Sequence, residues 1–168
     1  MLKHFSRTLG LPMAVLRLNY ACDLRYGVLV DLARKVWAGE PIDLAMGYFF
    51  PPGRILRELR HAIGRGVRVR LLVPRRTDVP AMRWASRGLY GRLLRMGVEI
   101  HEYLPAMLHA KLAVADDTVV IGSANLDLRS DRINHEIIAV VHDPGIAAAA
   151  RGEFEADLTR SERILMAD

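Results

Sequence analysis

Cysteine, lysine and long apolar runs are all scarce in this 168-residue sequence. Cys22 is the single cysteine, which excludes an intrachain disulfide framework and a cysteine-rich zinc site. No apolar stretch is long enough to cross a bilayer, and residues 1–21 contain no signal-peptide core. We therefore expect a protein that is cytoplasmic or peripherally bound at the inner membrane, with no transmembrane segment.

The histidines lack a pattern that would bind metal. Apart from His109, which is treated below, they are scattered without the repeated spacing of metal ligands. We predict that they are structural or lie on the surface, and we expect no metal and no cofactor. They are His4, His61, His101, His135 and His142.

Positive charge is plentiful and comes almost entirely from arginine. The formal net charge is +5 and the isoelectric point is about 9.8. A basic surface favours phosphate-bearing partners, and both anionic lipid surfaces and nucleic acid backbones qualify. Net charge does not separate these partners, and an arginine-rich composition can also produce only a solvated surface. We predict a mostly solvated face, with a membrane-contacting patch as the alternative, for Arg54, Arg57, Arg60, Arg65, Arg68 and Arg70.

The first half of the chain predicts alternating helices and strands. Apolar residues at four-residue steps predict a helix over 23–37, inside an N-terminal segment, 1–41, that we separate from the main domain, 42–168. Strand, helix, strand, helix, strand at this spacing calls for parallel pairing through right-handed crossovers. Strands are predicted at 42–50, 67–73 and 98–103, and helices at 54–63 and 80–96.

The second half predicts antiparallel pairing. The strand-like runs 109–115 and 118–122 are separated only by Asp116-Asp117, which indicates a hairpin. A further strand is expected at 136–142, and a helix at 146–158 closes the domain. The whole pattern predicts one α/β domain.

The segment HAKLAVADDTVVIGSAN gathers residues that can bind a phosphate. His109 and Lys111 are two residues apart on a predicted strand, so both side chains project from one face. Ser123 and Asn125 repeat this spacing after the next strand and add a hydroxyl and a carboxamide if the strands pair. A phosphodiester needs such donors, because charge grows on its non-bridging oxygens in the transition state.

The imidazole of His109 has a second role available, as the nucleophile that attacks phosphorus. For this role it must be neutral and correctly oriented, and a carboxylate on its far nitrogen would hold the tautomer. Glu136, on the strand that follows, is the candidate. A two-step scheme also needs an acid for the leaving oxygen. The sequence holds no second copy of the motif, so another polypeptide would have to supply that acid.

The pattern HxKxxxxD followed by GSxN resembles the HKD signature of the phospholipase D superfamily. Here it comprises His109, Lys111, Asp116, Gly122, Ser123 and Asn125. Further segments are similar to the C-terminal half of bacterial cardiolipin synthases, and the similarity spans roughly 42–164. They are YFFPP at 48–52, TDVPAMRWASRGLYGRLLRMGVEIHEY at 77–103, LDLRSDRINHE at 126–136 and FEADLTRSERI at 154–164. The resemblance implies a phospholipase D-like mixed sheet flanked by helices on both faces, as a half-domain with a single HKD motif.

The resemblance also implies a reaction, phosphatidyl transfer without a metal. A histidine attacks the phosphodiester of one phospholipid, and an alcohol such as the glycerol head group of phosphatidylglycerol resolves the phosphatidyl-histidine. Carried over by motif, His109 is nucleophile or acid and Glu136 orients it. Lys111, Ser123 and Asn125 hold the phosphate. Gly122 and Asp116 complete the motif, and the place of Asp116 beside the predicted turn favours a structural role over direct contact.

The sequence departs from this family in having one motif, whereas such relatives carry two that build a single site. Either two copies pair around a twofold axis, as single-motif relatives with nuclease or phospholipase activity do, or the chain is a fragment that lost its partner half. The leading interpretation is a cardiolipin synthase-like phosphatidyltransferase or phospholipase D acting on anionic phospholipid at a membrane surface. The alternatives are a homodimeric phosphodiesterase on nucleic acid and an inactive remnant or interaction module.

Three residues outside the motif are weaker candidates. Tyr48 and Phe49 end a predicted parallel strand, where open α/β sheets place ligands, although core packing is the expected role of Phe49. Arg129 adjoins the motif, and phosphate contact and a structural pair with Asp127 or Asp131 stay equally open.

Overall fold

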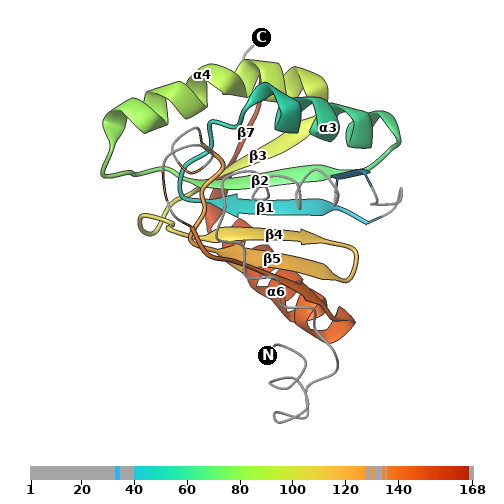
Figure 1. The fold of residues 1–168 in the computed structure, drawn as a ribbon. Helices are drawn as coiled ribbons and strands as arrows, with labels where there is room; N and C mark the ends of the chain where they lie inside the picture. The colour runs from blue at the N-terminus through green and yellow to red at the C-terminus, as the bar shows by residue number, and fades with distance from the viewer. Residues whose placement is uncertain (1–32, 35–39, 128–129, 131–133, 135, 167–168) are drawn as a thin grey trace.

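The computed structural model describes residues 33–34, 40–127, 130, 134 and 136–166, which form a seven-stranded mixed sheet with helices on both faces (Figure 1). The strand order is β6-β5-β4-β1-β2-β3-β7. Ala33 and Arg34 are helical. The rest of the helix predicted over 23–37, and most of the segment 1–41, lie outside the described residues. The α/β fold with helices on both faces is confirmed.

The centre of the sheet is parallel, as predicted. β1 pairs with β2 and β2 with β3 in parallel register, and every residue of β1 and β2 is buried. Burial on both faces explains why these strands are mainly apolar, with Asp43 and Arg70 as their only charged residues. The elements are β1 (Ile42–Met46), α3 (Gly53–Gly64), β2 (Val69–Pro74), α4 (Pro80–Met96) and β3 (Val98–Tyr103).

The remaining strands pair antiparallel. β4 and β5 form the predicted hairpin beside β1, and β6 pairs with β5. β7 pairs with the far side of β3 and was not predicted, because its sequence SERI has no apolar run; its two central residues are charged and exposed, as suits an edge strand. The elements are β4 (Lys111–Ala115), β5 (Thr118–Gly122), β6 (Ile138–His142), α6 (Pro144–Leu158) and β7 (Ser161–Ile164).

Helix boundaries follow from proline and glycine. α4 begins at Pro80 and ends before Gly97, whose φ of 96° is the left-handed conformation that glycine adopts without strain. α6 begins at Pro144, two residues earlier than predicted, since the Asp143 side chain accepts a hydrogen bond from Ile146 N at 2.8 Å and caps it.

Four predicted strand boundaries were wrong by two to four residues. β1 ends at Met46 instead of residue 50, β2 begins at Val69 instead of residue 67, β4 begins at Lys111 instead of residue 109, and β6 begins at Ile138 instead of residue 136. After β1 the chain turns away, and Phe49 keeps only an isolated bridge to Leu126. Beyond the strands, Gly47 N donates to Ala110 O at 2.8 Å and Phe50 N to Leu126 O at 2.6 Å, so the connecting segments lie against one another at the end of the sheet.

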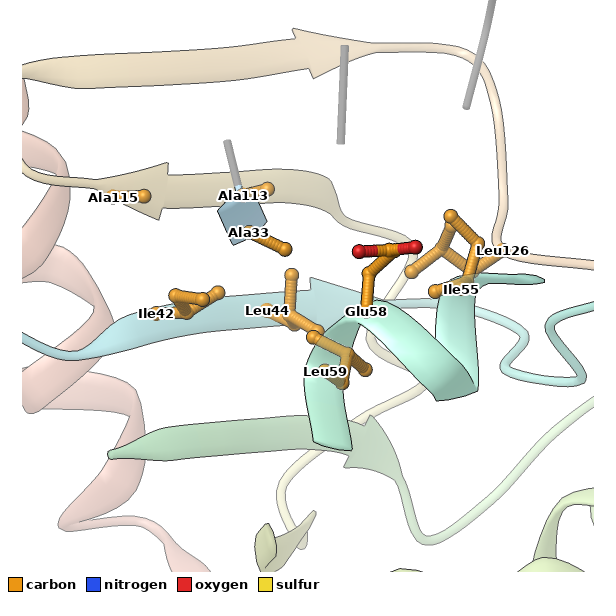
Figure 2. A pocket seen from close by; sticks show the side chains of 9 residues that line it. All are labelled: Ala33, Ile42, Leu44, Ile55, Glu58, Leu59, Ala113, Ala115 and Leu126. Carbon is orange, nitrogen blue, oxygen red and sulfur yellow. The ribbon is translucent and has the colours of Figure 1, made fainter. Parts of the chain in front are cut away.

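One face of β1 and β4 packs against α3 (Figure 2). Leu44, Leu59 and Ala113 are almost fully buried there, and Glu58 projects into the same layer at 5% exposure. Its carboxylate accepts hydrogen bonds from Arg34 at 3.2 and 3.3 Å. The remaining space is about 10 Å³, about one water molecule, and no residue of the predicted site lines it. This cavity therefore belongs to the core.

The opposite face carries a buried ion pair that corrects the prediction for one arginine. Arg70 is 6% exposed and donates to both carboxylate oxygens of Asp43, at 2.6 and 2.8 Å. It also pairs with Glu155 of α6 and lies over the Phe154 ring at 5.1 Å. Because side chains on a strand point alternately to the two faces, Arg70 points toward the face of the sheet that α6 covers. Its guanidinium therefore holds α6 against the sheet instead of facing solvent. No helix among the described residues is long and apolar enough to span a membrane.

Candidate active site

The pairing directions bring four chain segments to one edge of the sheet. β4 is antiparallel to β1, and Met46 therefore lies opposite Lys111. β5 is antiparallel to β4, and Gly122 lies opposite Ile138 at the start of β6. The end of β1, the start of β4, the end of β5 and the start of β6 thus share an edge, which lies at the left in Figure 1. Most of the predicted site residues are on these four segments.

His109 lies just before β4 and is exposed. Its ring meets the ring of Tyr48 edge to face, with 6.5 Å between centroids and an interplanar angle of 86°. Its backbone carbonyl accepts a hydrogen bond from Lys111 Nζ at 2.9 Å. The imidazole is therefore reachable from solvent at the edge of the sheet, and the lysine ammonium lies against the backbone of the same residue.

Lys111, the first residue of β4, is half-buried. Burial lowers its pKa below the ordinary value, and the nearby carboxylates of Glu136 and Asp127 act in the opposite direction. Lys111 lines a shallow pocket together with Gly122 and Asn125. A partly desolvated ammonium beside a carboxamide is suited to binding a phosphate oxygen.

Asn125 is oriented by its neighbours. Its Oδ1 accepts a hydrogen bond from Tyr48 N at 3.1 Å, and its own N donates to Ser130 Oγ at 3.2 Å. Because a backbone N–H can only donate, the Oδ1 end of the carboxamide is fixed as the acceptor and Nδ2 is the donor end. Gly47 makes this approach feasible, since a Cβ there would meet Asn125 Oδ1 at 3.3 Å.

Glu136 is buried at 7% exposure inside a hydroxyl network. Its Oε2 accepts from Ser123 Oγ, and its Oε1 accepts from Ser130 Oγ at 2.9 Å and from Asn134 Nδ2 at 3.1 Å. Ser123 Oγ also accepts from Ile137 N at 3.0 Å. The His109 ring is not among these described partners, so its orientation by Glu136 stays a prediction.

Gly122 occupies a position where no side chain fits. A Cβ there would lie 2.1 Å from Ile137 O and 2.9 Å from Ile138 Cα. This close approach lets Ser123 N donate to Ile137 O at 2.9 Å and brings Ser123 to the start of β6. The motif glycine thus places the serine of the cluster.

Asp116 lies at the opposite end of β4 from Lys111, in the β4–β5 turn, and is not gathered with the other motif residues. Its φ is 47°, in the left-handed region that aspartate adopts more readily than most residues. Its carbonyl accepts a hydrogen bond from Arg151 Nη2 at 3.2 Å, and burial raises the pKa of its carboxyl. This position suits support of the hairpin.

Three polar residues around the site were missed or only half anticipated. Tyr48, expected from its place at a strand end, donates its hydroxyl hydrogen to Asp78 Oδ1. Asp78 and Ser130 were not predicted as site residues, because neither belongs to a periodic pattern in the sequence. Phe49 is 1% exposed, as expected of a core residue.

The other histidines stand apart from the cluster. His61 is exposed near Glu58, His101 is half-buried with its pKa lowered by burial, and His142 contacts the Thr118 hydroxyl at 2.9 Å. Within the described part of the chain, no group of three or more possible ligands could hold a metal ion. His4, Arg129, Asp131 and His135 lie outside the described residues.

Known proteins resemble this chain in sequence and in fold. The family model described as cardiolipin synthase, PLD-like domain matches residues 37–158. Cardiolipin synthase A of Pseudomonas aeruginosa is 38% identical over 143 residues, which cover 83% of this chain and 28% of that protein. Cardiolipin synthase 2 of Bacillus cereus is 34% identical over 142 residues, covering 84% and 26%. The chain thus spans little more than a quarter of these relatives.

The fold has close counterparts among solved structures. The phospholipase D family member Nuc from Salmonella typhimurium superposes with a TM-score of 0.74 at 20% identity, over 92% of this chain and 100% of that one. The likeness to Nuc supports the fold, and the family match rests on sequence over most of the chain. This protein therefore belongs to the family of cardiolipin synthase-type, phospholipase D-like domains.

Proposed function

We propose that residues 42–168 form a catalytic domain that cleaves or transfers a phospholipid phosphodiester through a phospho-histidine at His109. The observation that carries this proposal is the convergence of His109, Lys111, Ser123 and Asn125 on one sheet edge, where the two ends of the β4–β5 hairpin meet the end of β1. The Lys111 ammonium and the Asn125 carboxamide match the needs of a phosphodiester, whose transition state gathers negative charge on oxygen, and the Ser123 hydroxyl, which donates to Glu136, ties that carboxylate to the same cluster.

The proposed first step forms a bond between an imidazole nitrogen of His109 and phosphorus as the bond from phosphorus to the leaving oxygen breaks. The leaving oxygen takes a proton from an acid. In the second step an acceptor oxygen bonds to phosphorus, the phosphorus–nitrogen bond breaks, and the acceptor proton returns to the group that acted as acid. Lys111 and Asn125 stabilise the non-bridging oxygens throughout.

We infer that the acid comes from a second copy of this chain or from a complementary half. The described residues hold no second HKD motif that could supply it. Two large apolar side chains next to the site are exposed, Ile121 at 50% and Ile137 at 55%. Ile121 lies opposite Ala139, so Ile137 is its diagonal neighbour on the same face. An apolar pair beside an incomplete site suits a surface that a second half covers.

The proposed substrate is an anionic phospholipid such as phosphatidylglycerol, met peripherally at a membrane surface. The support is the sequence similarity to proteins named cardiolipin synthases, together with a net charge of +5. A basic protein is attracted to anionic head groups.

The test is an assay of the purified chain on phosphatidylglycerol vesicles and on bis(p-nitrophenyl) phosphate, with and without a chelator. We expect release of product from both esters, insensitivity to the chelator, and an acid-labile phosphoryl adduct on the peptide that contains His109. Light scattering should give a dimer that Ile137→Lys converts to monomer with loss of turnover. If the chain is strictly monomeric and shows no turnover, the proposal that it catalyses the reaction by itself is wrong. An inactive remnant, or a chain that needs a complementary half, would then be favoured.

A second candidate, a phosphodiesterase on nucleic acid, is favoured by the single motif and the basic charge. Exposed arginines such as Arg60 of α3 would contact the phosphate backbone. The same assay with duplex and single-stranded DNA separates the two functions. Chelator-resistant DNA cleavage that falls steeply with salt, without lipid turnover, would replace the first proposal by the second.

A further inference from the structure

A carboxylate stands close to the proposed phosphate site, at the ends of β1 and β2. Asp78, in the loop before α4, accepts the Tyr48 hydroxyl hydrogen at Oδ1, and Thr77 Oγ1 donates to the same oxygen at 3.3 Å. Tyr48 also makes the ring contact with His109, at 6.5 Å between centroids. The Asp78 carboxylate is therefore one side chain removed from the imidazole that would carry the phosphoryl group.

The carboxylate is anionic and has capacity for another partner. The hydrogen bond from Tyr48 is the main cause that lowers the pKa of Asp78, with a smaller contribution from the nearby His109. Both side-chain hydrogen bonds go to Oδ1, and Asp78 is exposed, so Oδ2 can accept a hydrogen bond from a ligand. Two hydroxyl donors on one oxygen fix the direction in which the other oxygen points.

An anion at this place does not suit the donor phosphate, because like charges repel. It suits a group that donates hydrogen bonds and carries no charge, and an alcohol hydroxyl is such a group. The transfer reaction requires an alcohol to approach the phosphoryl-histidine. A fixed carboxylate beside His109 therefore has the chemistry of an acceptor subsite.

We propose that Asp78, held in place by Tyr48, binds a hydroxyl of the acceptor alcohol and so selects polyols such as a glycerol head group. This inference rests on the proposed function and assigns a specificity to its second step. One acceptor hydroxyl attacks phosphorus and gives its proton to the base from the second half, as the phosphorus–nitrogen bond breaks. A neighbouring hydroxyl of the same acceptor donates a hydrogen bond to Asp78, which takes no proton.

The preference should appear as a partition between alcohols and water. The experiment uses bis(p-nitrophenyl) phosphate as donor, with glycerol or 1-propanol at equal concentration, and measures transfer product relative to hydrolysis product. 1-Propanol has a single hydroxyl and cannot reach both phosphorus and Asp78. The wild-type chain should therefore transfer to glycerol several times more efficiently than to 1-propanol.

We call the ratio of transfer product to hydrolysis product the glycerol ratio or the propanol ratio, according to the alcohol present. Asp78→Asn is expected to lower the glycerol ratio about tenfold, which corresponds to the loss of one charge-assisted hydrogen bond. The propanol ratio should fall less than twofold. Tyr48→Phe should lower the glycerol ratio about threefold, because Asp78 remains but is less well held. Glu153→Gln, an exposed residue of α6 with the same charge change, is the matched control and should alter neither ratio. Circular dichroism checks that each variant is folded.

Equal loss of both ratios in Asp78→Asn, or an unchanged glycerol ratio, would overturn the acceptor subsite and leave Asp78 as a support for Tyr48. A wild-type chain that cleaves the donor without preferring glycerol over 1-propanol would overturn this inference alone. A wild-type chain that cleaves neither this ester nor phosphatidylglycerol would overturn the proposed function, and the inference with it.

Discussion

The parallel and antiparallel parts of the sheet are built for different purposes. In the parallel part, β1 and β2 are wholly buried, and their charged side chains are satisfied by bidentate pairs such as Arg70 with Asp43. In the antiparallel part, backbone approaches that tolerate no side chain, as at Gly122, place hydroxyls and carboxamides at an exposed edge. The first part supplies rigidity and, in the loops after β1 and β2, Tyr48 and Asp78, whereas the second supplies the residues of the proposed phosphate site.

The two parts also treat buried carboxylates differently. Glu102 of β3 is 0% exposed and is matched by a guanidinium, with Arg87 donating at 2.8 and 2.6 Å, and by the Tyr90 hydroxyl at 3.0 Å. The described partners of Glu136 are hydroxyls and an amide. The charge of Glu136 also acts on Lys111, where it opposes the lowering of the pKa by burial, whereas Glu102 serves to hold α4 against β3. The following substitutions test this division of labour.

The largest effect is expected for His109→Ala. The side chain is exposed and its loss removes the proposed nucleophile, so turnover of a phosphodiester should fall at least about a thousandfold with both parts of the sheet intact. Steady-state rates on bis(p-nitrophenyl) phosphate measure the loss, and thermal unfolding should stay within about 2 °C of wild type. His61→Ala, also exposed, is the matched control and should keep its activity. Comparable rates in the two variants would remove His109 from the mechanism.

Much of the fold could be predicted because local signals coincide with tertiary ones. Pro80 and Gly97 bracket α4, and the prediction of that helix is confirmed to the residue. Asp116-Asp117 between two apolar runs sets the β4–β5 hairpin, which fixes the register of Leu112 against Ile121. These features depend on residues close in sequence, for which single-residue conformational preferences decide.

The contacts between loops could not be predicted. Tyr48 meets Asp78 and Asn125 only because three loops converge on one edge of the sheet, and no periodicity records this. The burial of Arg70 was missed for a related reason, since an arginine inside a strand pairs with a carboxylate from a strand distant in sequence. Burial of charge is decided by the partner that the fold provides.

Arg70→Ala should destabilise the parallel part of the sheet. It leaves the fully buried Asp43 without its bidentate partner, and removing one member of a buried ion pair typically costs about 3–5 kcal/mol. We therefore expect the free energy of unfolding in urea to fall by about 3 kcal/mol. Arg92→Ala, an exposed arginine of α4, should change it by less than about 0.5 kcal/mol. Equal effects would mean that the pair contributes nothing to the rigidity assigned to this part.

Gly122→Ala should destabilise the antiparallel part of the sheet. The added methyl would lie 2.1 Å from Ile137 O, so β6 must shift away from β5, at a cost of about 2 kcal/mol. Because Ser123 and Glu136 lie on the two sides of this contact, activity should fall together with the free energy of unfolding. Gly152→Ala in α6, with no heavy atom near the added Cβ, should instead stabilise by about 0.5–1 kcal/mol. A neutral Gly122→Ala would show that the close approach is dispensable.

The smallest effect is expected for Lys111→Arg, which should change the pH above which the site loses its affinity for an anion. Burial lowers the pKa of Lys111 from its ordinary value of 10.5, and binding needs the protonated amine. Affinity for an anion is therefore present below this lowered pKa and is lost as the pH rises through it. Sulfate, whose charge is constant over this range, is a suitable competitive inhibitor.

We expect sulfate inhibition of wild type to weaken severalfold between neutral and alkaline pH, before an ordinary lysine would titrate. Arginine stays protonated throughout, so inhibition of Lys111→Arg should be nearly independent of pH, although a few times weaker at neutral pH because the guanidinium is larger. Tyr48 does not obscure the result, since burial and its hydrogen bond to Asp78 raise its pKa. Parallel pH profiles in the two proteins would mean that another group sets the limit. In that case the half-buried amine of β4 would not be the cation that holds the anion.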